Sequence, residues 1–202
     1  MSNLLRNIIK QTLKEKLIES IIDPPNIPGT INFWHGGNLD NYDDIIVQRN
    51  GRYEFGPGLY LTQNYSVAKK YAKGNRKLYL ITIETGNDIS DMLLDIDKVI
   101  EFVKNHVLSK LQKEILELIY SYNQNNKIRA YIFNNIILNH KAIKASKIHN
   151  LRLFYINNNI DYELLNNTLG FNQKMMILYN MKKIVNIIKI KPNDKISVFD
   201  LN

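Results

Sequence analysis

The chain has 202 residues, of which 45% are hydrophobic and 23% are charged, proportions ordinary for one globular domain with a sizeable core. It contains no cysteine, which excludes disulfides, thiolate nucleophiles and thiolate metal sites. The formal net charge of +8 fits a phosphate-rich partner. The lysines are nevertheless spread along the chain, as a composition rich in Asn, Ile and Lys also produces.

Apolar residues recur at helical spacing over residues 4–22, with basic residues off the stripe. We expect an N-terminal amphipathic helix within residues 1–28, stopped by Asp23–Pro25. Such a helix can bind a membrane surface or a partner, but packing on the domain is the commoner role. No apolar run is long enough to cross a bilayer, and Met1–Asn3 does not begin a secretory signal. We therefore expect a cytoplasmic protein, in its own cell or in an infected host, without stable membrane association.

Alternating apolar residues predict strands, and spacings of three and four residues predict helices, along the rest of the chain. The expected strands are 31–35, 59–61, 77–84, 160–162, 175–179 and 184–190. The expected helices are 66–72, 96–120, 128–138 and 142–156, with a turn at 170–172. We expect the last two strands to form a meander. This order predicts an α+β fold with a helical insertion at about residues 96–157, and it lacks the regular alternation of a doubly wound sheet.

The strongest functional signal lies around the first predicted strand. His35 stands near the end of that strand, followed by Gly36 and a second glycine. The turn at Gly56–Gly58 feeds the strand that carries Tyr60, and Tyr71 lies one helix later. A lone histidine beside glycines is more often structural, but glycine lets a ligand approach the backbone, and two tyrosines follow at pocket-forming positions. We interpret these residues as the wall of a ligand pocket.

Four motifs in this order carry a family resemblance. They read WHG at Trp34–Gly36, GPGLYLT at Gly56–Thr62, SVAKKYA at Ser66–Ala72 and KLYLITIE at Lys77–Glu84. Together they resemble the catalytic core of the ADP-ribosyltransferase fold, on the branch of diphtheria toxin and the poly(ADP-ribose) polymerases. The segment Met92–Ile100, MLLDIDKVI, further resembles phage-encoded polyvalent ADP-ribosyltransferase domains, in which a helical stretch follows. The resemblance implies that fold's split β-sheet core within residues 29–202.

That branch has a His-Tyr-Glu triad and a second tyrosine that stacks on nicotinamide. By this resemblance, His35 would bind a ribose hydroxyl, Gly36 would bind the carboxamide through its backbone, and Tyr60 and Tyr71 would sandwich the nicotinamide ring. The resemblance thus implies NAD as co-substrate and no metal. Physical chemistry agrees, because a residue without Cβ leaves its N–H and C=O accessible and aromatic faces stack on flat rings.

The third triad motif departs from the family. Aligning Tyr179-Asn180 with the family's terminal aromatic-acidic pair puts Met175 at the glutamate position, and Gln173 lies on the same strand face. Methionine has no acid–base chemistry, so we expect transfer of single ADP-ribose units rather than chain elongation. Glu163 and Glu84 are other carboxylates that could reach the pocket. The candidate catalytic residues are His35, Tyr60, Gln173 and Met175.

The resemblance implies a NAD-dependent mono-ADP-ribosyltransferase that modifies a protein or a nucleic acid, as bacterial toxins and phage proteins of this kind do. An inhibitor or antitoxin is a further candidate partner. The altered triad leaves a second interpretation open, a catalytically inactive module that binds NAD, ADP-ribose or nucleic acid. A third, an RNA 2′-phosphotransferase, needs several basic residues around the pocket, and only Arg52 and Arg76 lie near the motifs.

Overall fold

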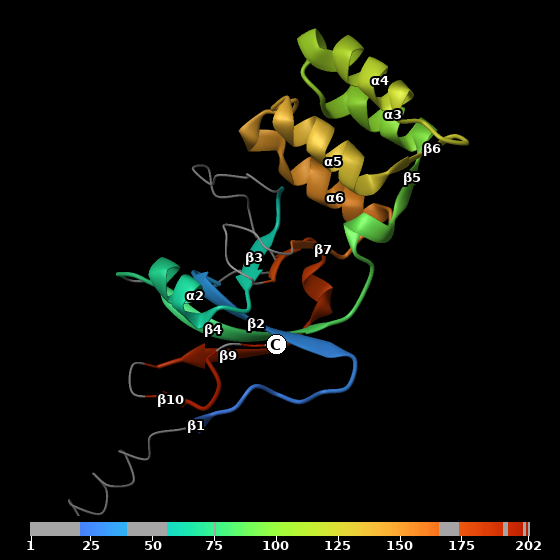
Figure 1. The fold of residues 1–202 in the computed structure, drawn as a ribbon. Coiled ribbons are helices and arrows are strands. Elements are labelled where there is room, and N and C mark those ends of the chain that lie inside the picture. Colours follow the sequence, from blue (N-terminus) through green and yellow to red (C-terminus); the bar gives the residue numbers. More distant parts are fainter. Residues whose placement is uncertain are drawn as a thin grey trace, which may run out of the picture.

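The structure is a computed structural model that describes residues 21–39, 56–74, 76–165, 174–191, 194–199 and 201. The described part is an α+β fold built on a six-stranded sheet (Figure 1), as the sequence predicts. Every neighbouring pair in this sheet is antiparallel. In spatial order the strands are β7 (Tyr162–Leu165), β8 (Met175–Leu178), β3 (Leu59–Thr62), β2 (Thr30–Gly37), β4 (Lys77–Glu84) and β9 (Ile184–Ile190).

The sheet consists of two three-stranded halves. Within the half β2-β4-β9, strands β2 and β4 pair along their whole length, from Thr30 with Glu84 to Gly37 with Lys77. Between the halves, by contrast, β2 and β3 share a single ladder pair, Trp34 with Thr62. Apolar side chains from one face of both halves, including Phe33, form a common buried cluster. The halves are therefore joined by one ladder pair and by a shared core.

The expected meander of the last two strands is wrong. Strand β8 lies between β7 and β3, whereas β9 lies at the opposite edge of the sheet, against β4. Only a short 3-10 turn, Met181–Lys183, separates the two strands in sequence. Consecutive strands with so short a connection usually pair with each other. Here Met181 and Ile184 belong to the core shared by the halves, so the connection crosses from one half to the other.

Helix α2 (Tyr65–Tyr71) covers the other face of the half β2-β4-β9. Its N-terminus is capped by Asn64, whose side chain accepts a hydrogen bond of 2.9 Å from the Val67 amide. Its buried residue Ala68 packs in a cluster with Trp34 and residues of β4. The short strands β1 (Ile21–Ile22) and β10 (Lys195–Ile196) pair in parallel beside this half.

Between β4 and β7 the chain forms a helical insertion with its own core, as predicted (Figure 1). It contains a two-stranded ladder of β5 (Leu93–Asp95) and β6 (Lys127–Arg129) and the helices α3 (Ile96–His106), α4 (Gln112–Ser121), α5 (Ala130–Asn139) and α6 (His149–Asn157). Asp95 caps α3 by accepting a 2.9 Å hydrogen bond from the Asp97 amide. Asp95 thus begins the insertion's first helix at the end of the MLLD segment.

The helices differ from the predicted ones at their ends. The single helix expected over 96–120 is broken after His106, because the Gln112 side chain donates to the carbonyls of Lys104 and Val107 and so caps the end of α3. The start of the helix expected over 128–138 forms strand β6 instead. In the stretch expected as a helix over 142–156, α6 begins only at His149, after a 3-10 turn.

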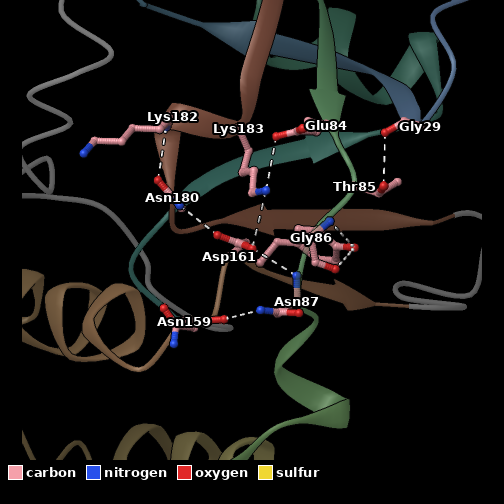
Figure 2. A network of polar contacts seen from close by, with 11 residues as sticks. Gly29, Glu84, Thr85, Gly86, Asn87, Asn159, Asp161, Asn180, Lys182 and Lys183 are labelled. Atoms are coloured by element: carbon pink, nitrogen blue, oxygen red, sulfur yellow. Dashed lines mark hydrogen bonds and ion pairs between the residues drawn. The ribbon is translucent and has the colours of Figure 1, made fainter.

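A polar network ties both ends of the insertion to the sheet (Figure 2). Buried Asp161 accepts hydrogen bonds from the Asn87 amide at 3.0 Å and from the Asn180 side chain at 2.7 Å. Lys183 lies 4.0 Å from Asp161 and 3.2 Å from Glu84. The network therefore joins the chain leaving β4, the chain leaving the insertion and the turn after β8.

At the N-terminus, Ile21 and Ile22 form strand β1 and not the end of the expected helix, because they pair with β10. The remainder of that helix and the turn expected at 170–172 lie outside the described residues. Within the described ranges, no helix has both the length and the apolar character needed to cross a membrane.

Candidate functional site at the break between two strands

Three of the predicted site residues, His35, Tyr60 and Met175, lie near the point where the two halves of the sheet separate. Strand β2 runs on from Trp34 to Gly37, and β3 begins at Leu59, but Trp34 and Thr62 are their only ladder pair. The strands therefore part at the end that carries His35 and Tyr60. Such a break leaves an edge of strand backbone available to a side chain or a ligand.

His35 bridges this break. Its Nδ1 lies 2.9 Å from the main-chain carbonyl oxygen of Tyr60. Because a carbonyl oxygen only accepts, this hydrogen bond requires the proton on Nδ1. Burial lowers the pKa of His35, and the bond to Tyr60 opposes this only in part. The ring is therefore neutral at pH 7, and its Nε2 can accept a hydrogen bond from a hydroxyl group.

The two glycines after His35 have different structural roles. A Cβ on Gly36 would collide with the main-chain carbonyl of Ala68 and lie 3.0 Å from the Ala72 nitrogen, so Gly36 lets α2 pack directly on β2. A Cβ on Gly37 would collide with the His35 ring at Nε2. From the sequence alone, only ligand approach accounts for Gly36, and Gly37 has no expected role. The structure adds a packing reason for the first and a ring-positioning role for the second.

Tyr60 lies on β3 with its hydroxyl donating to the Gly56 carbonyl at 2.8 Å. Its half-buried ring packs against the core of the helical insertion. Gly56 has a φ of 118°, which disfavours every residue with a side chain, and a Cβ there would lie 3.4 Å from the Tyr179 hydroxyl. The glycine turn of the sequence motif is therefore held by the hydrogen bond from Tyr60, and it lies beside the Tyr179 hydroxyl.

Tyr71 is the last residue of α2, and 57% of its surface is exposed. It follows Lys69 and Lys70, which are also exposed, while Ala68 faces the sheet. Tyr71 therefore extends from the helix that packs on Gly36, with its ring open to a ligand. That position is compatible with stacking on a flat ring.

Met175 begins β8 and pairs with Thr62, next to the ladder pair that joins the halves. It is half-buried. Gln173, the polar candidate two residues earlier, lies outside the described residues, as does Arg52. Arg76 is exposed after α2. The structure thus brings His35, Tyr60 and Met175 to the junction of the halves.

A buried polar cluster beside Tyr60 was missed from the sequence. Glu163 Oε2 accepts hydrogen bonds from the Tyr179 hydroxyl at 2.9 Å and from the Asn134 side chain at 3.1 Å. The Tyr155 hydroxyl donates to Asn134 at 2.8 Å. The sequence does contain one indication of this cluster, because Asn134 interrupts the apolar face of the α5 segment. In the structure Asn134 is buried on that face.

Burial sets the proton equilibria of this cluster. It raises the pKa of Glu163 to about 7, with a further rise from the charge of Asp88 and a partial reduction by the Tyr179 hydrogen bond. Burial also raises the pKa values of Tyr155 and Tyr179, and the nearby Glu163 charge adds to both. The tyrosines therefore act as hydrogen-bond donors, and Glu163 is the titrating group.

The other carboxylate considered from the sequence lies elsewhere. Glu84 pairs with Thr30, at the end of β2 and β4 opposite to His35, and bonds to Lys183. Hollows of about 310 Å³ and 400 Å³ lie on the insertion and beside residues 24–32, and neither is lined by a predicted site residue. Comparisons of the chain with protein-family models, with curated proteins and with solved structures found no match.

Proposed function

We propose that the protein is a NAD-dependent mono-ADP-ribosyltransferase that transfers ADP-ribose to a protein or a nucleic acid. The observation that carries the proposal is the break between β2 and β3. There His35 and Tyr60 are joined by a hydrogen bond, and the helix that ends at Tyr71 packs on Gly36. These are the residues on which the resemblance to ADP-ribosyltransferases rests.

The arrangement suits the chemistry of NAD. The neutral His35 ring offers Nε2 as an acceptor for a ribose hydroxyl. In the transfer, the bond between ribose C1′ and the nicotinamide nitrogen breaks, and its electron pair leaves with the now neutral nicotinamide. A nucleophile on the acceptor forms the new bond at C1′ and loses its proton. Positive charge develops on the ribose meanwhile, so a nearby carboxylate lowers the barrier.

The positive charge around α2 favours the binding of an anionic ligand. Exposed basic residues flank Tyr71 along the helix and the following turn: Lys69, Lys70, Lys73 and Arg76. In the part of the chain that the structure describes, none of the ion pairs involves these four side chains. NAD carries two phosphates and a nucleic-acid acceptor many, and both are attracted by an exposed basic surface.

One observation favours a second candidate function. Met175 stands where the resembling enzymes have glutamate and supplies no acid–base group. A catalytically inactive module that binds NAD, ADP-ribose or nucleic acid fits this substitution. Such a protein would bind NAD or ADP-ribose without releasing nicotinamide, which separates it from the transferase.

Replacing Tyr71 with alanine should weaken NAD binding by about 1–3 kcal/mol, by analogy with the stacking of bases on aromatic side chains. The loss corresponds to a roughly 5- to 150-fold higher Kd. Calorimetric titration with NAD would measure it. Tyr120, on α4 of the insertion and 54% exposed, provides the matched control, and Tyr120→Ala should bind NAD like the wild type. Equal affinities of Tyr71→Ala and Tyr120→Ala would remove Tyr71 from the site.

A further inference from the structure

We propose that Glu163 is the general base of this site and takes the proton from the acceptor nucleophile. The inference rests on the proposed transferase function. It assigns to Glu163 the acid–base role that Met175 cannot perform. Its basis is the position of Glu163 on the sheet and the hydrogen bonds that hold its carboxyl group.

Glu163 lies on the same face of the sheet as Tyr60. In the half β7-β8-β3, Glu163 pairs with Ile177, and Ile177 pairs with Tyr60. Paired residues of neighbouring strands point to the same face, so Glu163 and Tyr60 share the face covered by the helical insertion. Gly56, which accepts the Tyr60 hydrogen bond, lies beside the Tyr179 hydroxyl, and that hydroxyl bonds to Glu163. The glycine turn of the motif is thereby connected to the carboxyl group.

The hydrogen bonds orient the carboxyl group. Both donors, the Tyr179 hydroxyl and the Asn134 amide, bind Oε2. Among the residues that the structure describes, none donates a hydrogen bond to Oε1. Among the described residues, the carboxyl group is therefore oriented through Oε2 alone, and an oriented carboxylate suits a catalytic base.

Other carboxylates at this end of the insertion are fully engaged. Asp88 uses one oxygen for the amide and hydroxyl of Ser90 and the other for the Leu164 amide. Asp161 uses one oxygen for Asn180 and the other for Asn87 and Lys183. Their bonds hold the insertion on the sheet, whereas in the described part of the chain Glu163 accepts hydrogen bonds on Oε2 alone.

The proton transfer to Glu163 needs no reactant beyond NAD and the acceptor. As C1′ of the ribose loses nicotinamide, the acceptor's hydroxyl or amine forms a bond to C1′, and its proton passes to the Glu163 carboxylate. Loss of that proton to solvent restores the carboxylate for the next turnover. A base with a pKa close to 7 is half ionised at neutral pH and can take a proton effectively there.

Among the described residues, the titratable groups near Glu163 come from several elements. They are Tyr179 after β8, Tyr155 on α6, Asp88 before the insertion and, next to Tyr179, Tyr60 on β3. Arg152 on α6 donates to the Tyr179 main-chain carbonyl at 2.6 Å. The Tyr179 hydrogen bond lowers the pKa of Glu163, so its removal should raise that pKa.

The test compares Glu163→Gln with Glu84→Gln. The second variant has the same chemical change, but it lies at the end of β4 farthest from His35. Steady-state nicotinamide release and acceptor modification are measured from about pH 5 to pH 9, and NAD affinity is measured by calorimetry. Glu163→Gln should lower kcat roughly 100-fold or more, with NAD affinity unchanged, and should abolish the ionisation near pH 7 in the kcat profile. Glu84→Gln should behave like the wild type. Tyr179→Phe should keep the ionisation but move its midpoint to higher pH.

The outcomes separate the two proposals. Wild-type turnover and an unaltered pH profile in Glu163→Gln would contradict the base role and leave the transferase function standing. A wild-type protein that releases no nicotinamide would contradict the function and, with it, this role. A folded Glu163→Gln protein, verified by circular dichroism, that binds NAD but has lost turnover would support both.

Discussion

Replacing Gly36 with alanine should lower the free energy of unfolding by about 3 kcal/mol, at the upper end of the usual cost of overpacking. The added Cβ would occupy the position of the Ala68 main-chain carbonyl and crowd the Ala72 nitrogen. Main-chain atoms of a helix cannot rotate out of the way as a side chain can, so α2 must move off the sheet. Urea unfolding of the wild type and the variant would measure the loss.

The neighbouring glycine provides the matched control. A Cβ on Gly37 would meet only the His35 ring, which can rotate. Gly37→Ala should therefore cost clearly less stability than Gly36→Ala, while weakening NAD binding through the displaced histidine. Equal losses of stability in the two variants would contradict the packing of α2 on Gly36.

Raising the pH from about 5 to 8 should reduce the stability of the wild type by up to about 3 kcal/mol more than that of Glu163→Gln. The pKa of Glu163 is about 7 in the folded protein, above the ordinary value of 4.5 that it regains on unfolding. Between these values the folded state binds more protons than the unfolded state, so its stability falls as the pH rises. Glutamine keeps the shape of the protonated group and cannot ionise.

Urea unfolding at several pH values would show this as a difference between the two proteins. The wild type should approach the variant at the acid end and fall below it above pH 7. Parallel pH dependence of the two proteins would mean that Glu163 titrates near its ordinary pKa, exposed to water.

The local sequence pattern predicts much of this fold, because strands and helices are encoded at short range. Alternation is sufficient to predict β2, β3 and β4, and the insertion follows from its helical spacing. The break after α3 is less predictable, since it depends on a glutamine side chain that reaches back to the carbonyls of Lys104 and Val107. The separation of β8 from β9 depends on how two half-sheets join, which no local pattern encodes.

The candidate site likewise contains residues that the sequence predicts and residues that only the folded structure reveals. His35, Gly36, Tyr60 and Tyr71 lie in short motifs, so they can be found from the sequence. The cluster around Glu163 cannot, because its hydrogen bonds join residues 16 and 29 positions apart on different elements. The packing of Gly36 on Ala68 likewise becomes visible only when α2 is placed on the sheet.

Release of nicotinamide from NAD by the purified protein tests the central claim most directly. Chromatography of the small molecules and mass spectrometry of the acceptor would follow the wild type and His35→Ala together. We expect nicotinamide release with single ADP-ribose units on the acceptor, and a loss of both NAD affinity and turnover in His35→Ala, because the proposed hydrogen bond to the ribose would form before the reaction and persist during it. No release from the wild type, undiminished release from His35→Ala, or ladders of repeated ADP-ribose units would contradict the account.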